Sequence, residues 1–132
     1  MAIVAYWLSF EGRLRRSDFW GRVIAVSVAV CIWLPVMFIA RDAMTSDGFM
    51  YFVLAVGFPF YALMAVMNVS THVRRWHDRD KSGWWILIGL IPMVGPIWSF
   101  VECGFLDGTP GPNRFGPSPK ADELAGRAGA PA

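Results

Sequence analysis

One short polar segment holds most of the side chains in this sequence that could do chemistry. Residues 74–85 read RRWHDRDKSGWW, so a histidine, two aspartates, four basic residues and three tryptophans stand between two apolar runs. An enzyme acting on lipid headgroups would use His77 as a general base with Asp78 as its partner. Adjacent residues do not face each other on a helix. The spacing therefore argues against this pair, and we expect a protein that is not an enzyme.

The same region is a poor metal site. Its possible ligands are His72, His77, Asp78 and Asp80. Their spacing matches no common ligand pattern with a defined coordination geometry. We expect neither a metal ion nor another cofactor.

A second polar segment, residues 10–20, reads FEGRLRRSDFW and mixes arginines with aromatic residues. Arginines suit the phosphate layer of a bilayer, whereas aromatic rings suit its apolar boundary. We expect residues 1–22 to form an amphipathic segment on the membrane surface, with Asp18 as a counter-charge for the arginines of residues 74–85. The alternative is a solvated basic flank that has no further role.

The elements that would hold these segments are apolar helices. Hydrophobic residues make up 55% of the 132 residues and charged residues only 17%, against about a quarter charged in an average soluble domain. Crossing a hydrocarbon core of roughly 30 Å takes about 20 apolar residues. The sequence therefore predicts an all-α integral membrane protein with three transmembrane helices, at about residues 23–40, 48–71 and 83–104. The membrane domain then covers residues 23–106, with a polar loop at residues 72–82.

Basic residues set the expected orientation. Eight of them stand before the first span or in the loop at residues 72–82, whereas only Arg41 stands between the first and second spans. Loops rich in arginine and lysine stay in the cytoplasm. We therefore expect a bacterial inner-membrane protein with a cytosolic N-terminus, whose two basic segments lie on one face next to an anionic leaflet.

The third span is interrupted by Pro92, Gly95 and Pro96. Proline removes a backbone donor and clashes with the preceding helical turn, so the segment is either one kinked helix or a re-entrant pair of half-helices. Its length suffices for one crossing and not for two, which favours the kinked crossing.

The C-terminal part of the chain has a different composition. Residues 107–132 are rich in glycine, proline and alanine and show no apolar period, so we expect most of this tail to be disordered. The exception is PNRFGP, residues 112–117, a candidate motif in which Asn113, Arg114 and Phe115 stand between turn-forming residues.

Three of these stretches also resemble a known family. FEGRLRRSDFW, RRWHDRDKSGWWILIGLIPMVGPI and GPNRFGP, in this order, are similar to the signature segments of small bacterial inner-membrane proteins catalogued as domain of unknown function 805. The resemblance covers about residues 6–117 and implies a multi-pass protein whose signature polar residues gather near the membrane surface. It implies no activity. The family pattern often has a tyrosine at the position of Phe115, so this chain lacks a hydroxyl group there.

These observations predict a non-enzymatic accessory or organising protein whose cytosolic Arg/Trp/Asp cluster contacts anionic lipid headgroups or a larger membrane-protein partner. The contact residues are predicted to be Arg13, Arg16, Trp20, Arg74, Arg75, Trp84 and Trp85, around a polar cluster of Asp18, His77 and Asp78. One alternative is a transporter component with a site at the broken third span. The other is the lipid-headgroup enzyme that uses His77 and Asp78. A net charge of +2 is too small to indicate a nucleic-acid partner.

Overall fold

A computed structural model of the chain describes residues 2–121, with side chains from residue 5 onward. All of its regular elements are helical. In chain order they are α1 (Ala2–Leu8), α2 (Arg16–Ala43), α3 (Ser46–Phe52), the π-helical η1 (Val53–Gly57), α4 (Phe58–Asp78), the 3₁₀-helical η2 (Gly83–Leu90) and α5 (Val94–Gly104).

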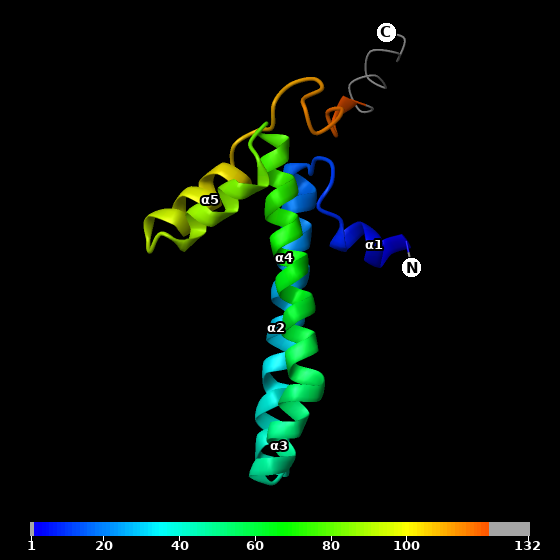
Figure 1. Cartoon of the computed structure of the whole chain (residues 1–132), viewed down its shortest axis with the longest axis vertical. Helices are drawn as coiled ribbons and strands as arrows, with labels where there is room; N and C mark the ends of the chain where they lie inside the picture. Colours follow the sequence, from blue (N-terminus) through cyan, green and yellow to red (C-terminus); the bar gives the residue numbers. More distant parts are fainter. Residues whose placement is uncertain (1, 122–132) are drawn as a thin grey trace.

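A long helical hairpin dominates the structure. Helix α2 runs beside the continuous rod formed by α3, η1 and α4 (Figure 1). The two arms contain 28 and 33 residues, and both are long and apolar enough to cross a membrane. At 1.5 Å per residue they measure about 42 and 50 Å. The first two predicted spans, residues 23–40 and 48–71, lie inside these arms.

A short turn joins α2 to α3 at the end of the hairpin that is remote from residues 74–78. The side chain of Thr45 caps α3 by accepting a hydrogen bond from the Gly48 amide at 3.3 Å. Close to this turn, the ring of Trp33 stacks on Phe60 with centroids 4.6 Å apart. Most other apolar side chains along the hairpin face outward, as helices surrounded by lipid require.

Residues 83–104 differ from the favoured prediction of a single kinked crossing. The chain turns back between η2 and α5, so that both ends of the segment lie beside the end of α4 (Figure 1). Lys81 Nζ lies 2.9 Å from Glu102 Oε1, and Arg75 Nε donates to the Cys103 carbonyl at 2.7 Å. With eight and 11 residues, each arm measures about 16 Å, half the hydrocarbon thickness.

The reversal has a local cause. Pro92 lies in the turn, where its missing amide hydrogen costs no helical hydrogen bond. Gly95 lets the two arms meet, because a Cβ atom at this position would overlap the Ile88 carbonyl oxygen. The described structure therefore gives the kinked third crossing no support, and the two half-helices return to the end of the hairpin from which they start (Figure 1). Two helical arms of the described chain, rather than three, are candidate membrane spans.

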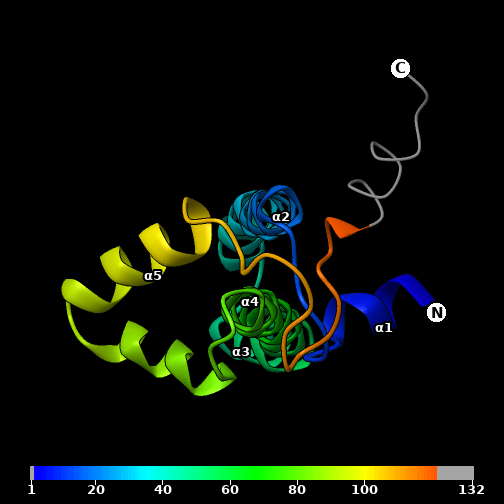
Figure 2. The ribbon, with the colours of Figure 1, turned by 90° about the horizontal axis from the view of Figure 1, so that it is seen from above.

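Helix α1, η2 and α5 all meet the hairpin at the same end (Figure 1). Helix α1 and the η2–α5 pair leave this end on opposite sides, and the segment after α5 crosses over the ends of α2 and α4 (Figures 1 and 2). A small core lies beneath that segment, formed by Leu14, Phe19, Trp76 and Cys103. We call the polar part of this end, residues 9–16, 74–82 and 105–120, the polar cap.

The predicted N-terminal and C-terminal segments are only partly as expected. The N-terminal segment, residues 1–22, is not one unit, because α2 already begins at Arg16. Residues 107–121 lie on the polar cap, and backbone hydrogen bonds between Asn113 and Gly116 close a turn within them. The prediction of disorder is therefore wrong for residues 107–111 and 118–121, whereas residues 112–117 were excepted from it. The rest of that prediction, for residues 122–132, lies outside the described part of the chain.

Candidate functional site: a buried ionic cluster in the polar cap

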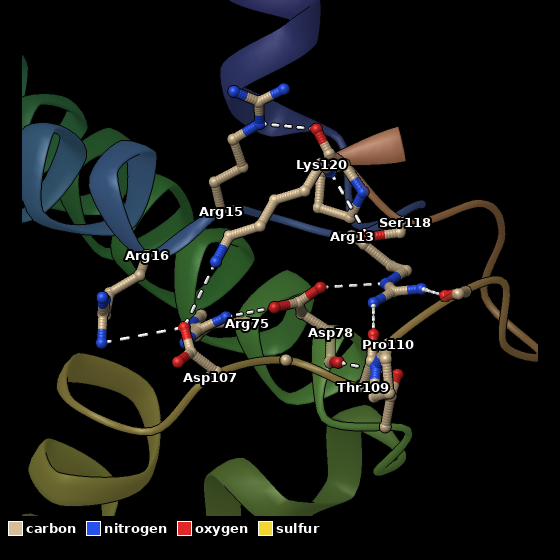
Figure 3. Close-up of a pocket in the computed structure, with 13 residues that line it drawn as sticks. Arg13, Arg15, Arg16, Arg75, Asp78, Asp107, Thr109, Pro110, Ser118 and Lys120 are labelled. Carbon is tan, nitrogen blue, oxygen red and sulfur yellow. Dashed lines mark hydrogen bonds and ion pairs between the residues drawn. The ribbon is translucent and has the colours of Figure 1, made fainter. Parts of the chain in front are cut away.

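The centre of the polar cap is a carboxylate held between two arginines. Arg13 Nε lies 2.9 Å from Asp78 Oδ1, and Arg75 Nη1 contacts Asp78 Oδ2 (Figure 3). The three side chains are 2%, 1% and 5% exposed for Arg13, Arg75 and Asp78. Burying a charge costs several kcal/mol unless it is paired and hydrogen-bonded. The trio therefore has to form as a unit when the cap folds.

The remaining donors of the two arginines bind backbone carbonyls. Arg13 donates to the carbonyls of Thr109 and Gly111, both at 2.6 Å. Arg75 donates to those of Cys103 at 2.7 Å, Leu14 at 3.3 Å and Leu106. A guanidinium group offers five donors in a rigid planar fork. Here most of them join the N-terminal loop, α5 and the tail to α4, which is a structural role.

The tail has to approach Asp78 closely. A Cβ atom at Gly108 would overlap the Asp78 carboxylate. The next residue closes the helix end, because the Thr109 amide donates to the Asp78 carbonyl at 2.8 Å. Carbonyls in the last turn of a helix lack intrahelical partners. The tail thus completes the end of α4, and only glycine fits at position 108.

The predicted tail motif also binds the end of α4. Asn113 Nδ2 donates to the His77 carbonyl at 2.9 Å, and the Phe115 amide donates to Asn113 Oδ1 at 2.9 Å. Arg114 Nε forms an ion pair with Asp80 Oδ1 at 3.2 Å. The predicted tail motif therefore binds the C-terminal end of α4 and the turn that follows it.

His77 makes contacts that do not suit a general base. Its ring stacks on Phe115 with centroids 3.9 Å apart, and its Nδ1 lies 3.3 Å from the Gly12 carbonyl oxygen. Its proposed partner, Asp78, is occupied by Arg13 and Arg75. The stack needs no hydroxyl group on residue 115. The geometry gives the catalytic alternative no support.

The outer residues of the cap serve to attach its arms. Arg74 and Arg22 lie over the ring of Tyr6, at 4.8 and 4.4 Å from its centroid, and so hold α1 against the hairpin. Trp20 Nε1 donates to the Gly104 carbonyl at 3.0 Å and holds the end of α5. Arg74 and Trp20 were predicted from the sequence as lipid or partner contacts, and each contacts other parts of the protein instead.

Other predicted residues lie on the surface. Trp84 is 78% exposed on η2, and Trp85 packs against Lys81, whose Nζ lies 4.7 Å above the indole. Asp18 is exposed on the first turn of α2 and stays outside the buried trio, in which Asp78 takes the place of the expected counter-charge. Arg16 is half-exposed and donates to the Phe105 carbonyl at 2.9 Å.

One member of the cap was missed in the sequence. Glu102 Oε2 lies 2.9 Å from Arg79 Nε and Glu102 Oε1 lies 2.9 Å from Lys81 Nζ. The position of Glu102 in the sequence could have indicated its role, since a carboxylate at the end of a long apolar run needs a cationic partner. The assumption that residues 83–104 continue across the membrane placed it far from Lys81.

The surface above the trio is hollowed into a cavity of about 190 Å³ (Figure 3). Around it lie Arg15, Arg16, Asp107, Ser118 and Lys120. The hydrogen bond from Lys120 and the nearby Arg16 hold the pKa of Asp107 below its usual value, so this carboxylate is ionised at neutral pH. The cavity is basic on balance and faces away from the hairpin.

Known proteins match the chain along nearly its whole length. The family described as "Protein of unknown function (DUF805)" matches residues 7–117. The inner membrane protein YhaH of Escherichia coli K12 is 31% identical over 92% of this chain and 96% of its own length. The inner membrane protein YhaI of the same strain is 29% identical over 91% of this chain and 93% of its own length. No solved structure matches significantly.

Proposed function

The chain belongs to the DUF805 family, and from this membership and the geometry of the polar cap we propose a non-enzymatic accessory protein of the bacterial inner membrane that contacts anionic lipid headgroups. The contact surface is the outer, basic side of the cap. Its exposed cations are Arg16, Arg114 and Lys120.

One observation carries the proposal: both short arms leave the hairpin at the end that bears the polar cap (Figure 1). These arms expose large apolar side chains, including Tyr6, Trp84 and Trp98. Tryptophan and tyrosine side chains are favoured at the interface of a bilayer. A hairpin that crosses the membrane, with two arms lying in the headgroup layer, accounts for this shape.

Charge spacing along α2 supports this placement. Arg22 and Arg41 are 19 residues apart, which corresponds to about 28 Å along a helix. The hydrocarbon core is roughly 30 Å thick. The two arginines can therefore mark its two boundaries, which puts the cap in the headgroup layer.

The charge bias assigns the cap to the cytosol. Ten basic residues belong to the cap or to the neighbouring first turns of α2, whereas Arg41 at the other end is accompanied by Asp42 and Asp47. The positive-inside rule then places the N-terminus on the cytosolic side. Because η2 and α5 return to the cap, residues 105–121 belong on the same side.

Burial separates the cations that can meet lipid from those that cannot. Arg13 and Arg75 bind Asp78 and backbone carbonyls, so they are not free to contact headgroups as predicted. The exposed cations make this contact in the proposal. A basic residue near an anionic leaflet contributes about 1 kcal/mol. The transporter alternative gains no support, because the broken segment lies beside the hairpin and not within a helical bundle.

The test compares anionic with zwitterionic lipid. The double variant Arg16→Gln, Lys120→Gln is incorporated into nanodiscs that contain phosphatidylglycerol and phosphatidylcholine, and the lipids retained after detergent extraction are counted by native mass spectrometry. We expect the preference for phosphatidylglycerol to fall about fivefold for each cation removed. Arg41→Gln, at the opposite end of α2, is the matched control. An unchanged preference in the double variant would contradict the proposal.

A further inference from the structure

A second cavity lies between the long hairpin and the η2–α5 pair. Its volume is about 360 Å³, within the size range of small-molecule sites. Its walls come from α2 (Phe19, Trp20, Val23), from α4 (Asn68, His72) and from η2 and α5 (Ile86, Gly89, Pro96, Ser99, Phe100). The predicted contact residues included Trp20 alone from this set.

The lining combines apolar surface with a few polar groups. Aromatic and aliphatic side chains supply most of it, and Asn68, His72 and Ser99 supply the polar atoms. His72 Nδ1 lies 2.9 Å from the Asn68 carbonyl oxygen. Since a carbonyl oxygen only accepts, Nδ1 carries a proton, and in this tautomer Nε2 is a hydrogen-bond acceptor. An edge contact with Phe19, at 5.3 Å between centroids, holds the ring.

The depth of the cavity indicates what surrounds it. In the proposed placement Arg22 marks the hydrocarbon boundary, and Val23 is the next residue along α2. Phe19 and Trp20 lie about 3 to 4 Å nearer the cap. The cavity therefore crosses the level at which the headgroup layer meets the acyl chains. Lipid, with its polar glycerol esters and apolar tails, matches both parts of the lining.

The direction of the cavity also fits a lipid. Arg16 lies one helical turn above Trp20 on the same face of α2 and is half-exposed. A phosphate group that leaves the cavity toward the cap would meet this cation. The lining residues Val23, Ile86 and Gly89 have no charge and offer apolar contacts to an acyl chain.

From these observations we infer that the cavity binds one phospholipid molecule, with its glycerol esters beside His72, Asn68 and Ser99 and an acyl chain along Val23 and Gly89. The inference rests on the membrane placement of the proposed function.

Gly89 offers a direct way to fill the cavity. A Cβ atom at Gly89 would meet nothing within 4 Å, so a leucine there extends into open space without a backbone clash. Gly21 on the exposed face of α2 also has open space around its Cβ position. Gly21→Leu therefore adds the same side chain outside the cavity and serves as the control.

The experiment uses the full chain in detergent micelles with added phosphatidylcholine, and native mass spectrometry measures the fraction that keeps one lipid. The zwitterionic lipid separates this site from the preference for anionic headgroups. We expect wild type and Gly21→Leu to retain one lipid and Gly89→Leu to retain roughly tenfold less, because leucine displaces the acyl chain from apolar contacts. Equal retention by both glycine variants, or an adduct with the mass of detergent only, would overturn the inference.

A second variant tests the inference if Gly89→Leu fails to fold, as a loss of its helical circular dichroism signal would show. His72→Phe keeps the ring beside Phe19 and removes the hydrogen-bonding nitrogens, so single-lipid retention should fall severalfold. Unchanged retention in a folded His72→Phe protein would then overturn the inference. Loss of the phosphatidylglycerol preference in the single variant Lys120→Gln, whose residue lines the other cavity, is a separate result. A single lipid that depends on position 89 can persist when that preference is absent.

Discussion

The polar cap and the long hairpin distribute their side chains in opposite ways. The cap buries Arg75 and Asp78, whereas the hairpin exposes large apolar residues such as Ile32 and Phe38. In the hairpin the surrounding lipid takes the place of a core, so outward apolar residues cost nothing. In the cap the protein itself has to supply partners for every buried charge. Specific contacts should therefore decide the stability of the cap, and general apolar character that of the hairpin.

The largest effect should follow from removing the carboxylate of the buried trio. Asp78→Asn leaves Arg13 and Arg75 without a counter-charge in a buried site. Breaking a buried ion pair by removing one partner costs about 3 to 5 kcal/mol. Unfolding by SDS in mixed micelles, followed by circular dichroism, should show this loss. Asp18→Asn, on the exposed first turn of α2, should stay within about 0.5 kcal/mol of wild type.

A matched pair of leucines compares the two regions directly. Leu14 is fully buried beneath the cap, and Leu34 faces outward from α2. Leu14→Ala should cost about 2 to 5 kcal/mol, because it leaves a cavity in a packed core. Leu34→Ala should change the free energy of unfolding by about 0.5 kcal/mol or less, because lipid refills the space and alanine favours the helix. Equal losses in the same SDS titration would remove the distinction between the regions.

A smaller effect is expected where the tail passes over Asp78. Gly108→Ala places a methyl group on the carboxylate, so the tail has to shift. Overpacking of this kind costs about 1 to 3 kcal/mol. Hydrogen exchange should show faster exchange at residues 105–116 and unchanged protection in the hairpin. Gly21→Ala, where the Cβ position is open, should leave both regions as protected as in wild type.

The long arms of the hairpin could be predicted from the sequence, since an uncharged run of about 20 apolar residues is typical of a membrane span. The reversal of residues 83–104 could not be predicted. Pro92 and Gly95 fit a kinked helix as well as a turn, and nothing in their neighbourhood separates the two. The decisive contacts are distant in sequence: Arg75 with the Cys103 carbonyl, and Lys81 with Glu102.

The site was predictable in its location and less so in its pairing. Two basic segments expected on one side of a membrane do meet, with Arg13 on Asp78. The sequence pointed to Asp18 as the counter-charge, because short-range spacing cannot tell which carboxylate becomes buried. The tail looked disordered by composition. Its order comes from the donors of Arg13 and from Asn113, which act across about a hundred and about 36 residues respectively.

The most direct test of the account is the side on which each end of the chain lies. Alkaline phosphatase and green fluorescent protein are fused in turn to the N-terminus and after residue 121, and their activities are measured in intact bacterial cells. The return of η2 and α5 to the polar cap predicts fluorescent, phosphatase-inactive fusions at both positions. An active phosphatase after residue 121, together with a fluorescent N-terminal fusion, would mean that residues 83–104 cross the membrane and would contradict the account.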